Sequence, residues 1–306
     1  MLLPLHVFAN GDPAVTELFF QQELSVAKIL ITLSMLALLG YASIVGALYL
    51  AQERIIFPGT KLPPDHKFSF DQPYREVQVE VPGASLNALH ITQPAPRGLL
   101  FFIHGNGGDL STWTTGVDFY RKVNYDLFIF DYRGYGKSTG KIESEAQLHA
   151  DVRAAWDTIA PQYRARNIPI VIYGRSLGTG LAAQLARDVD PALVIMVSSY
   201  TSLLAASKRA YTIAPDWILK YPLRTDAIIG DVKSPIMMIH GKQDELIPHT
   251  DSEQLRKHVR APSSLLIIDG AGHNDIHQFP VYLEALEADS NHCNLLIYCD
   301  FNFLVY

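Results

Sequence analysis

The chain has little cysteine and no concentrated charge. Of its 306 residues only two are cysteine, and both, Cys293 and Cys299, lie among the last fifteen. Two cysteines so placed do not make a disulfide framework. The net charge is −6, without a basic tract or a basic-aromatic stripe, which argues against a nucleic acid as partner. Apolar residues make up 48% of the chain, enough for a sizeable core in one large domain or two small ones.

An uncharged apolar stretch of 22 residues follows the N-terminal segment 1–28 and covers residues 29–50. About 20 residues suffice to cross a bilayer as a helix, so the stretch predicts a single-pass membrane helix. Two alternatives remain open. One is a buried core helix, which at this length normally shows a polar stripe. The other is a cleaved signal peptide, with Val45-Gly46-Ala47 as the small-residue cleavage site.

The charges that flank this stretch do not decide its orientation. One lysine precedes it, and three cations follow it within about twenty residues. A count of positive charges then places the rest of the chain in the cytoplasm, but the margin is only two charges. The sequence therefore predicts a membrane location and leaves the side of the catalytic domain undetermined.

Residues 51–75 are rich in proline and polar residues and predict a linker before a domain at 76–290. The domain opens with "REVQVEV" and "ASLNALHI", which predict an antiparallel hairpin with Pro82 and Gly83 at its turn. Six short apolar runs follow, as in strands that are buried on both faces. They cover 98–104, 125–131, 168–174, 192–198, 235–241 and 264–269.

Helical patterns lie between these apolar runs. The clearest covers 144–160, where Ser144 and Gln147 form a capping box before an amphipathic pattern. A second helix begins at Ser176 and is rich in small residues that allow close packing on a sheet. Strands that alternate with helices predict an α/β fold with a mostly parallel central sheet and flanking helices. A long stretch of mixed character at about 200–233 predicts a short helical cap over the strand ends.

The sequence "GRSLG" runs from Gly174 to Gly178 and fits the pattern G-x-S-x-G. It lies where a buried strand ends and a small-residue helix begins, the setting in which Ser176 would be an exposed nucleophile on a sharp turn. Such a serine needs a base and an orienting acid. Asp244 and His273 each follow a predicted strand, in the chain order that this turn requires. The three residues are therefore the predicted catalytic triad.

Acyl transfer also needs hydrogen-bond donors for the oxyanion. The backbone N–H of Leu177, directly after the serine, is the first predicted donor. The second is the backbone N–H of Asn106, in the glycine-rich segment "HGNGGD" at 104–109. That segment lacks the Lys-Ser/Thr of a phosphate-binding loop and the spacing of a dinucleotide-binding loop, so a nucleotide site is not expected.

Five motifs in order, "HGNGG", "DYRGYGKSTG", "GRSLGTG", "HGKQDELIP" and "GAGHND", resemble those of the α/β-hydrolase superfamily over residues 76–288. With the apolar helix they look like its membrane-anchored, bud-emergence-type (Bem-like) branch. The resemblance implies the same triad, Ser176, Asp244 and His273, and activity as an esterase, thioesterase or depalmitoylase. Its departure is the apolar tail 291–306, for which the sequence predicts no role.

Other residues leave two interpretations open. Arg175 is a candidate contact for an anionic substrate group or a brace for a neighbouring loop. Trp217 and Tyr221 are candidates for an acyl pocket or for packing within the cap. His273 and His277 lie four apart, but no glutamate between them and no third ligand supports a zinc site, so no metal and no organic cofactor are expected.

These patterns together predict a membrane-anchored serine hydrolase of the carboxylesterase or acyl-thioesterase type. Its substrate would be an acyl ester or thioester near the bilayer, such as an acylated lipid or a lipidated protein. One alternative is an amidase or peptidase. The alternative from another class is a non-catalytic hydrolase-fold scaffold tethered to the membrane, against which an intact triad argues.

Overall fold

The computed structural model describes residues 13–115 and 122–292, and it divides the chain into two compact units. One unit ends at Ala51, and the other begins at Gln52. The predicted tail 291–306 lies outside the described residues, except for its first two.

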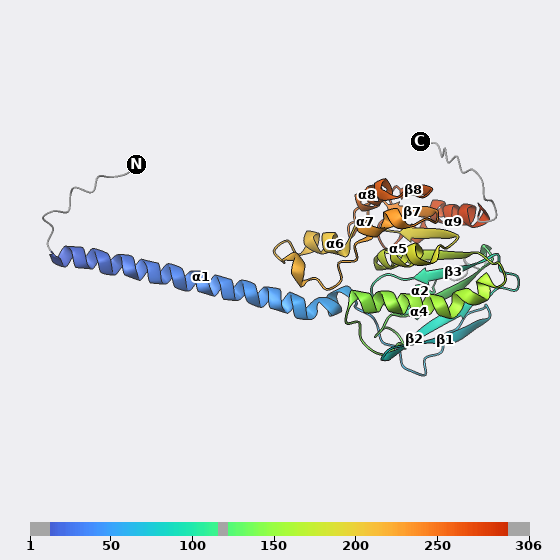
Figure 1. Ribbon diagram of the computed structural model, residues 1–306, viewed down its shortest axis with the longest axis horizontal. Helices are drawn as coiled ribbons and strands as arrows, with labels where there is room; N and C mark the ends of the chain where they lie inside the picture. The colour runs from blue at the N-terminus through green and yellow to red at the C-terminus, as the bar shows by residue number, and fades with distance from the viewer. Residues whose placement is uncertain (1–12, 116–121, 293–306) are drawn as a thin grey trace. The chain divides into compact units, whose positions relative to one another are not determined.

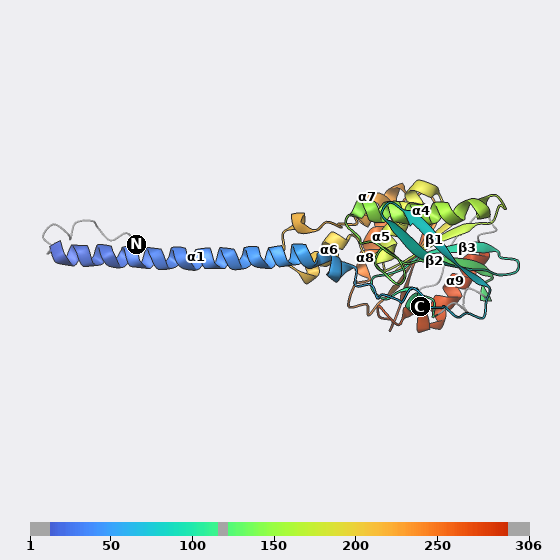
Figure 2. The ribbon, with the colours of Figure 1, turned by 90° about the horizontal axis from the view of Figure 1, so that it is seen from below.

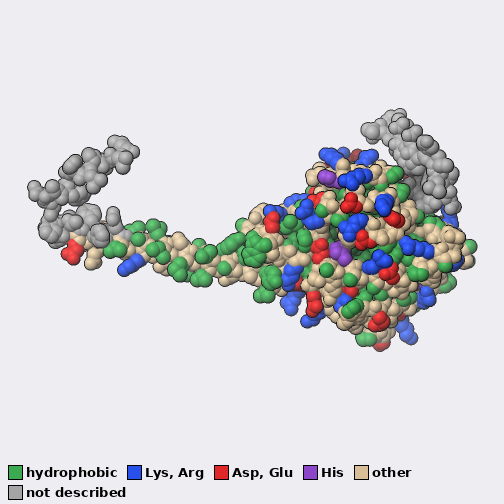
Figure 3. All heavy atoms as spheres, viewed as in Figure 1, with side chains coloured by type: hydrophobic (Ala, Val, Ile, Leu, Met, Phe, Trp, Pro, Cys, Tyr) green, Lys and Arg blue, Asp and Glu red, His purple; other side chains and the backbone are tan. Residues whose placement is uncertain are grey.

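The first unit is built on helix α1 (Pro13–Ile56), whose last five residues belong to the second unit. The predicted apolar stretch 29–50 lies wholly within this helix. Between Leu24 and Ile56 the helix is long and apolar enough to cross a membrane, with a mean hydropathy of 2.1 in its 18-residue apolar window. Figure 3 shows hydrophobic side chains along the middle of α1 and mixed charges over the second unit. The helix is thus a candidate span by length and composition.

The second unit contains one eight-stranded sheet, in the order β1-β2-β4-β3-β5-β6-β7-β8. Strands β1 (Tyr74–Val81) and β2 (Ala84–Ile91) form the predicted antiparallel hairpin at one edge, and β2 pairs antiparallel with β4. All remaining pairs are parallel. The six remaining strands are β3 (Gly98–Ile103), β4 (Tyr125–Phe130), β5 (Ile170–Arg175), β6 (Leu193–Val197), β7 (Ile236–Gly241) and β8 (Ser263–Ile268).

Helices cover both faces of this sheet (Figures 1 and 2). On one face lie α4 (Glu145–Arg164), α5 (Leu177–Val189) and α8 (Thr250–His258), which pack into the first core cluster. On the other lie α2 (Leu110–Trp113) and α9 (Pro280–His292), which pack into the second. Alternate strand residues enter opposite clusters, which is why these strands are apolar without a break.

The predicted cap contains short helical pieces. They are α6 (Leu203–Ala210), η1 (Asp216–Ile218), α7 (Thr225–Ile228) and η2 (Ile229–Asp231). A further 3-10 turn, η3 (Ile276–Gln278), precedes α9. The capping box is present, because the hydroxyl of Ser144 accepts a hydrogen bond from the N–H of Gln147 at 3.1 Å. The predicted α/β fold with a mostly parallel sheet and flanking helices is confirmed.

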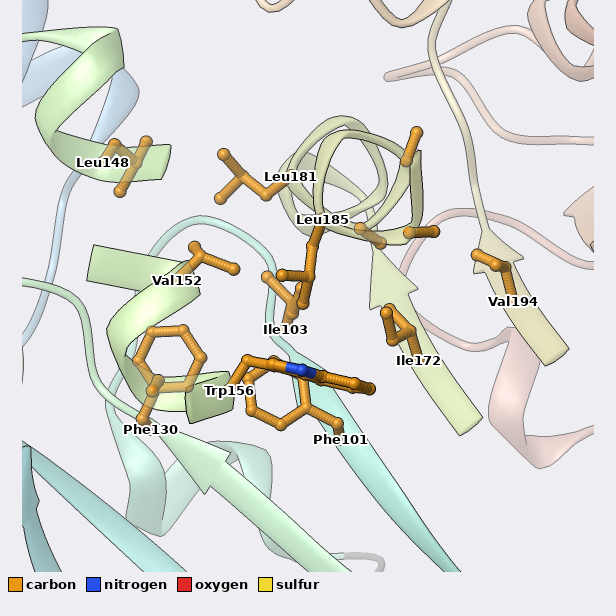
Figure 4. Packing of buried hydrophobic residues seen from close by; sticks show 14 of the residues in the cluster. Phe101, Ile103, Phe130, Leu148, Val152, Trp156, Ile172, Leu181, Leu185 and Val194 are labelled. Carbon is orange, nitrogen blue, oxygen red and sulfur yellow. The ribbon is translucent and has the colours of Figure 1, made fainter. Parts of the chain in front are cut away.

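Trp156 is the largest fully buried side chain of the first core cluster, and it packs edge-to-face on Phe101 with 5.3 Å between ring centroids (Figure 4). Replacing it by alanine leaves a cavity, so we expect Trp156→Ala to lower the free energy of unfolding by about 3–5 kcal/mol. Urea unfolding measures the loss. The matched control is Trp217→Ala, because 77% of that side chain is exposed. Equal losses in the two variants would contradict the assignment of the core.

Candidate active site

Ser176 lies at the joint between β5 and α5, with a φ of 51° and a ψ of −120° that a residue with a side chain rarely adopts. Glycines on both sides of the serine allow the strand and the helix to approach each other closely. A Cβ added to Gly174 would lie 2.7 Å from the Cβ of Ala182, and one added to Gly178 would overlap the carbonyl oxygen of Ile103. The turn therefore requires glycine on both sides of the serine, as the pattern predicts.

The structure brings the three predicted catalytic side chains into one hydrogen-bonded chain. Nε2 of His273 lies 3.0 Å from Oγ of Ser176, and Nδ1 of His273 lies 2.7 Å from Oδ2 of Asp244. The side chain of Asp244 is completely buried, and 11% of that of His273 is exposed. This arrangement can pass a proton from the serine hydroxyl to the imidazole while the carboxylate fixes the ring.

Asp244 accepts hydrogen bonds from other groups besides His273. Its Oδ1 accepts hydrogen bonds from the N–H groups of Leu246 and Ile247, at 3.0 and 2.8 Å. Its Oδ2 also lies 3.3 Å from Nε2 of the buried His240. Burial alone would raise the pKa of Asp244, but the hydrogen bonds from His240, His273 and Ile247 outweigh it and hold that pKa well below its usual range. The carboxylate is therefore ionised near neutral pH.

His240 has no site role in the sequence-based prediction, yet it contacts the predicted catalytic acid. Its Nε2 lies 2.9 Å from the carbonyl oxygen of Ile247, and its Nδ1 lies 2.7 Å from Oγ of Ser252. Because the carbonyl only accepts, Nε2 carries the proton and Nδ1 accepts from the serine hydroxyl. In the sequence, the feature that could have indicated this contact is the position of His240, four residues before Asp244 and at the end of a buried strand.

The predicted oxyanion donors lie on two elements. Leu177 is the first residue of α5, so its N–H has no acceptor within the helix. Asn106 lies in the loop 104–109 after β3. That loop approaches the serine closely, because a Cβ added to Gly105 would lie 3.3 Å from the Cβ of Ser176 and 2.9 Å from the ring of Trp113.

Arg175 lies between the triad and this loop. Its guanidinium donates a hydrogen bond of 3.1 Å to the carbonyl of His273 and lies 5.5 Å from the ring centroid of Trp113. Trp113 in turn donates from Nε1 to the carbonyl of Gly107 at 3.0 Å. Of its two predicted roles, the contacts within the chain favour bracing of neighbouring loops.

The two candidate acyl-pocket residues differ in exposure. Trp217 is 77% exposed. Tyr221 is fully buried, with its ring edge-to-face on Phe57 at 4.9 Å and its hydroxyl 3.4 Å from a carboxylate oxygen of Glu53. Their roles toward a substrate stay predictions.

Two buried ionisable groups lie at the start of the loop 104–109 and in the turn beside it. Nε2 of His104 lies 3.7 Å from Oδ1 of Asp131, and both side chains are fully buried. Burial lowers the pKa of His104 to about 4 and raises that of Asp131 to about 8. Near pH 7 these pKa shifts favour the neutral form of both groups.

A family model described as serine aminopeptidase, S33, matches residues 94–220, a stretch that includes Ser176 and ends before Asp244. Alpha/beta hydrolase domain-containing protein 17C of Xenopus tropicalis is 34% identical over 219 residues, which are 69% of this chain and 67% of that protein. The chain belongs to the α/β-hydrolase superfamily.

Two further comparisons agree with this membership. Alpha/beta hydrolase domain-containing protein 17B of Xenopus laevis is 35% identical over 202 residues, which are 63% of this α/β-hydrolase and 66% of that protein. The match thus spans slightly less than two thirds of that relative. The Pyrococcus furiosus esterase Pf2001 has a TM-score of 0.60 over 76% of this chain and 98% of its own, at 19% identity. That likeness shows the fold alone.

The buried Asp131 gives the hydrolase a pH-dependent stability. Its pKa rises on folding from 3.8 to about 8, so between these values the unfolded chain ionises first. Stability is then lost as pH rises, by at most about 1.4 kcal/mol per pH unit. We expect Asp131→Asn, which keeps an acceptor for the N–H of Leu110, to gain stability relative to wild type as pH rises from 5 to 8.

Urea unfolding at several pH values in this range measures the difference between variant and wild type. The control is Asp269→Asn, at a position whose side chain is 79% exposed. A difference between Asp131→Asn and wild type that stays constant with pH would contradict the raised pKa.

Proposed function

We propose that this α/β-hydrolase cleaves acyl esters or thioesters through a covalent acyl-enzyme. The observation that carries the proposal is the hydrogen-bonded chain from Ser176 through His273 to Asp244, with distances of 3.0 and 2.7 Å. It supports a serine mechanism because a hydroxyl needs a base within hydrogen-bond reach to act as a nucleophile near neutral pH.

In the proposed reaction, Oγ of Ser176 attacks the carbonyl carbon while Nε2 of His273 takes its proton. The N–H groups of Leu177 and Asn106 stabilise the negative charge on the carbonyl oxygen. The imidazolium then gives its proton to the departing alcohol or thiol, and the acyl group remains on Ser176. Water, deprotonated by the same imidazole, attacks the acyl carbon. The bond from that carbon to Oγ of Ser176 then breaks, the imidazolium returns its proton to Oγ, and the acid leaves. No step requires a metal or an organic cofactor.

The apolar helix α1 supports a membrane-anchored form of this enzyme. Leu24–Ile56 has the length and hydropathy of a span, and about 20 residues suffice to cross the hydrocarbon core. Anchoring would keep the active site near the bilayer, which favours an acylated lipid or a lipidated protein as substrate. The side of the membrane is left open.

The first test is hydrolysis of p-nitrophenyl esters of increasing acyl length, and of the matching thioesters, by the full chain in detergent. We expect Ser176→Ala to lower the rate by at least about 1,000-fold, because the acyl-enzyme can no longer form. The control is Ser207→Ala, because the hydroxyl of Ser207 donates to the carbonyl of Leu204 in its own helix. The preferred acyl length measures the acyl pocket.

A serine-directed fluorophosphonate gives an independent reading of the same site. Wild type should be labelled and Ser176→Ala should not. A folded wild type that resists labelling would remove the catalytic proposal and favour a scaffold. Faster cleavage of aminoacyl p-nitroanilides than of any ester would instead favour the peptidase alternative, which the aminopeptidase family model supports.

Extraction of membranes with alkaline carbonate tests the anchor. We expect the full chain to stay in the pellet, since a spanning helix is held by its apolar area rather than by charge. As a control, Leu36→Asp with Leu39→Asp places two charges in the middle of the stretch and should release the protein. Release of the wild type, or a mature N-terminus just after Ala47, would contradict a retained span.

A further inference from the structure

The segment 57–62 directly follows α1, and it lies against the loop that carries a proposed oxyanion donor. The N–H of Thr60 donates to the carbonyl of Gly108 at 2.9 Å, and Gly59 and Gly108 form an isolated parallel bridge. A Cβ added to Gly107 would lie 3.9 Å from Pro58. The sequence predicts only a linker here, yet these residues touch the active-site loop.

The same segment is held on its other side by the turn 131–138. The N–H of Gly136 donates to the carbonyl of Thr60 at 2.7 Å, and the N–H of Leu62 donates to the carbonyl of Gly136 at 3.0 Å. Nζ of Lys61 adds a bond of 3.2 Å to the carbonyl of Ser138. Thr60 thus joins the oxyanion loop to the turn through its two backbone groups.

The start of the segment is anchored in the cap. Phe57 is buried, and its ring packs on Tyr221. Four residues before Phe57, in the last turn of α1, Glu53 forms an ion pair of 2.7 Å with Lys220. Because both ends of the segment are bound to the domain, Thr60 meets Gly108 as part of an ordered strap.

The loop depends on such outside bonds. Gly107 and Gly108 have φ values of 76° and 67° and carry no side chains with which to pack. Trp113 donates to the carbonyl of Gly107, and the N–H of Thr60 donates to the carbonyl of Gly108. The N–H of Asn106 lies two residues before the bonded carbonyl of Gly108, so a shift of this short backbone would also move that N–H.

We propose that the strap 57–62 positions the oxyanion loop, and that the N–H of Thr60 is the positioning group. This inference rests on the proposed serine mechanism and extends it to a segment outside the triad. The segment that directly follows the apolar helix would then help to set the geometry of the active site. Thr60 touches no substrate and acts only through the backbone of Gly108.

The test compares Thr60→Pro, which removes the N–H, with Thr60→Ala, which keeps it and changes only an exposed side chain. Both are made in the full chain in detergent, and active sites are counted with the fluorophosphonate. We expect Thr60→Pro to lower kcat per active site about 10- to 100-fold with KM little changed. Removing an oxyanion donor outright costs about 100- to 1,000-fold. Thr60→Ala should stay within about twofold of wild type.

A trifluoromethyl ketone inhibitor separates positioning from a simple loss of folded protein. Its adduct with the serine carries an oxyanion, so its Ki should rise in Thr60→Pro in parallel with the fall in kcat. A merely structural role would lower the number of labelled sites and leave Ki and kcat per site unchanged. That result overturns the proposal, as does equal behaviour of the proline and alanine variants.

A second variant covers the case in which Thr60→Pro does not fold. In Gly59→Ala the new Cβ would overlap the ring of Tyr135, which moves the strap while every N–H remains. It should also lower kcat per site and raise Ki. The matched control is Gly46→Ala, where a Cβ meets no atom within 4 Å. An unchanged kcat and Ki in Gly59→Ala would overturn the proposal.

Measurements on the wild type distinguish a failure of the strap proposal from a failure of the serine mechanism. Turnover that Ser176→Ala abolishes means that the serine mechanism stands, and the Thr60 variants then decide the strap alone. A folded wild type with neither turnover nor labelling removes the serine mechanism and the strap proposal with it.

Discussion

The close contact between the end of β3 and the start of α5 sets the geometry of this active site. The carbonyl oxygen of Ile103 lies where a side chain on Gly178 would begin, so the helix can reach the sheet only with glycine there. The contact places the loop that continues β3 beside the proposed nucleophile. Ser176 is held in its strained conformation by bonds on both sides, since its N–H donates to Val197 and its carbonyl accepts from Thr179.

The parallel strands then bring the other side chains to the same edge. β5, β7 and β8 end one, three and five residues before Ser176, Asp244 and His273. β6 lies between β5 and β7 in the sheet. Because carboxyl ends of parallel strands meet at one edge, three residues far apart in sequence need only short loops to converge. The bonds that His240 and two backbone N–H groups make to Asp244 hold its carboxylate in place without help from the substrate.

Much of this could be predicted from the sequence, for identifiable physical reasons. Burial on both faces makes each central strand a continuous apolar run, and the tight joint requires glycines at fixed spacing around Ser176. His240 was not predicted as a contact of Asp244, because a buried histidine after an apolar run has the same pattern whatever it bonds. The contacts of Arg175 with His273 and Trp113 join the end of a strand, a loop and a short helix that no local pattern relates.

The segment 57–62 was harder still to predict, because isolated bridges involve single residues and leave no periodic pattern. Its proline and polar residues are typical of linkers, yet its backbone is bonded to two loops.

The energies involved are small enough for such a contact to matter. A net hydrogen bond contributes about 0.5–1.5 kcal/mol to stability, and a tenfold change in rate corresponds to about 1.4 kcal/mol. Gly107 and Gly108 have no side chains, so this part of the loop has little packing energy of its own with which to resist displacement. One bond from Thr60 to Gly108 is therefore of the size needed to determine whether an N–H two residues earlier faces the reacting oxygen.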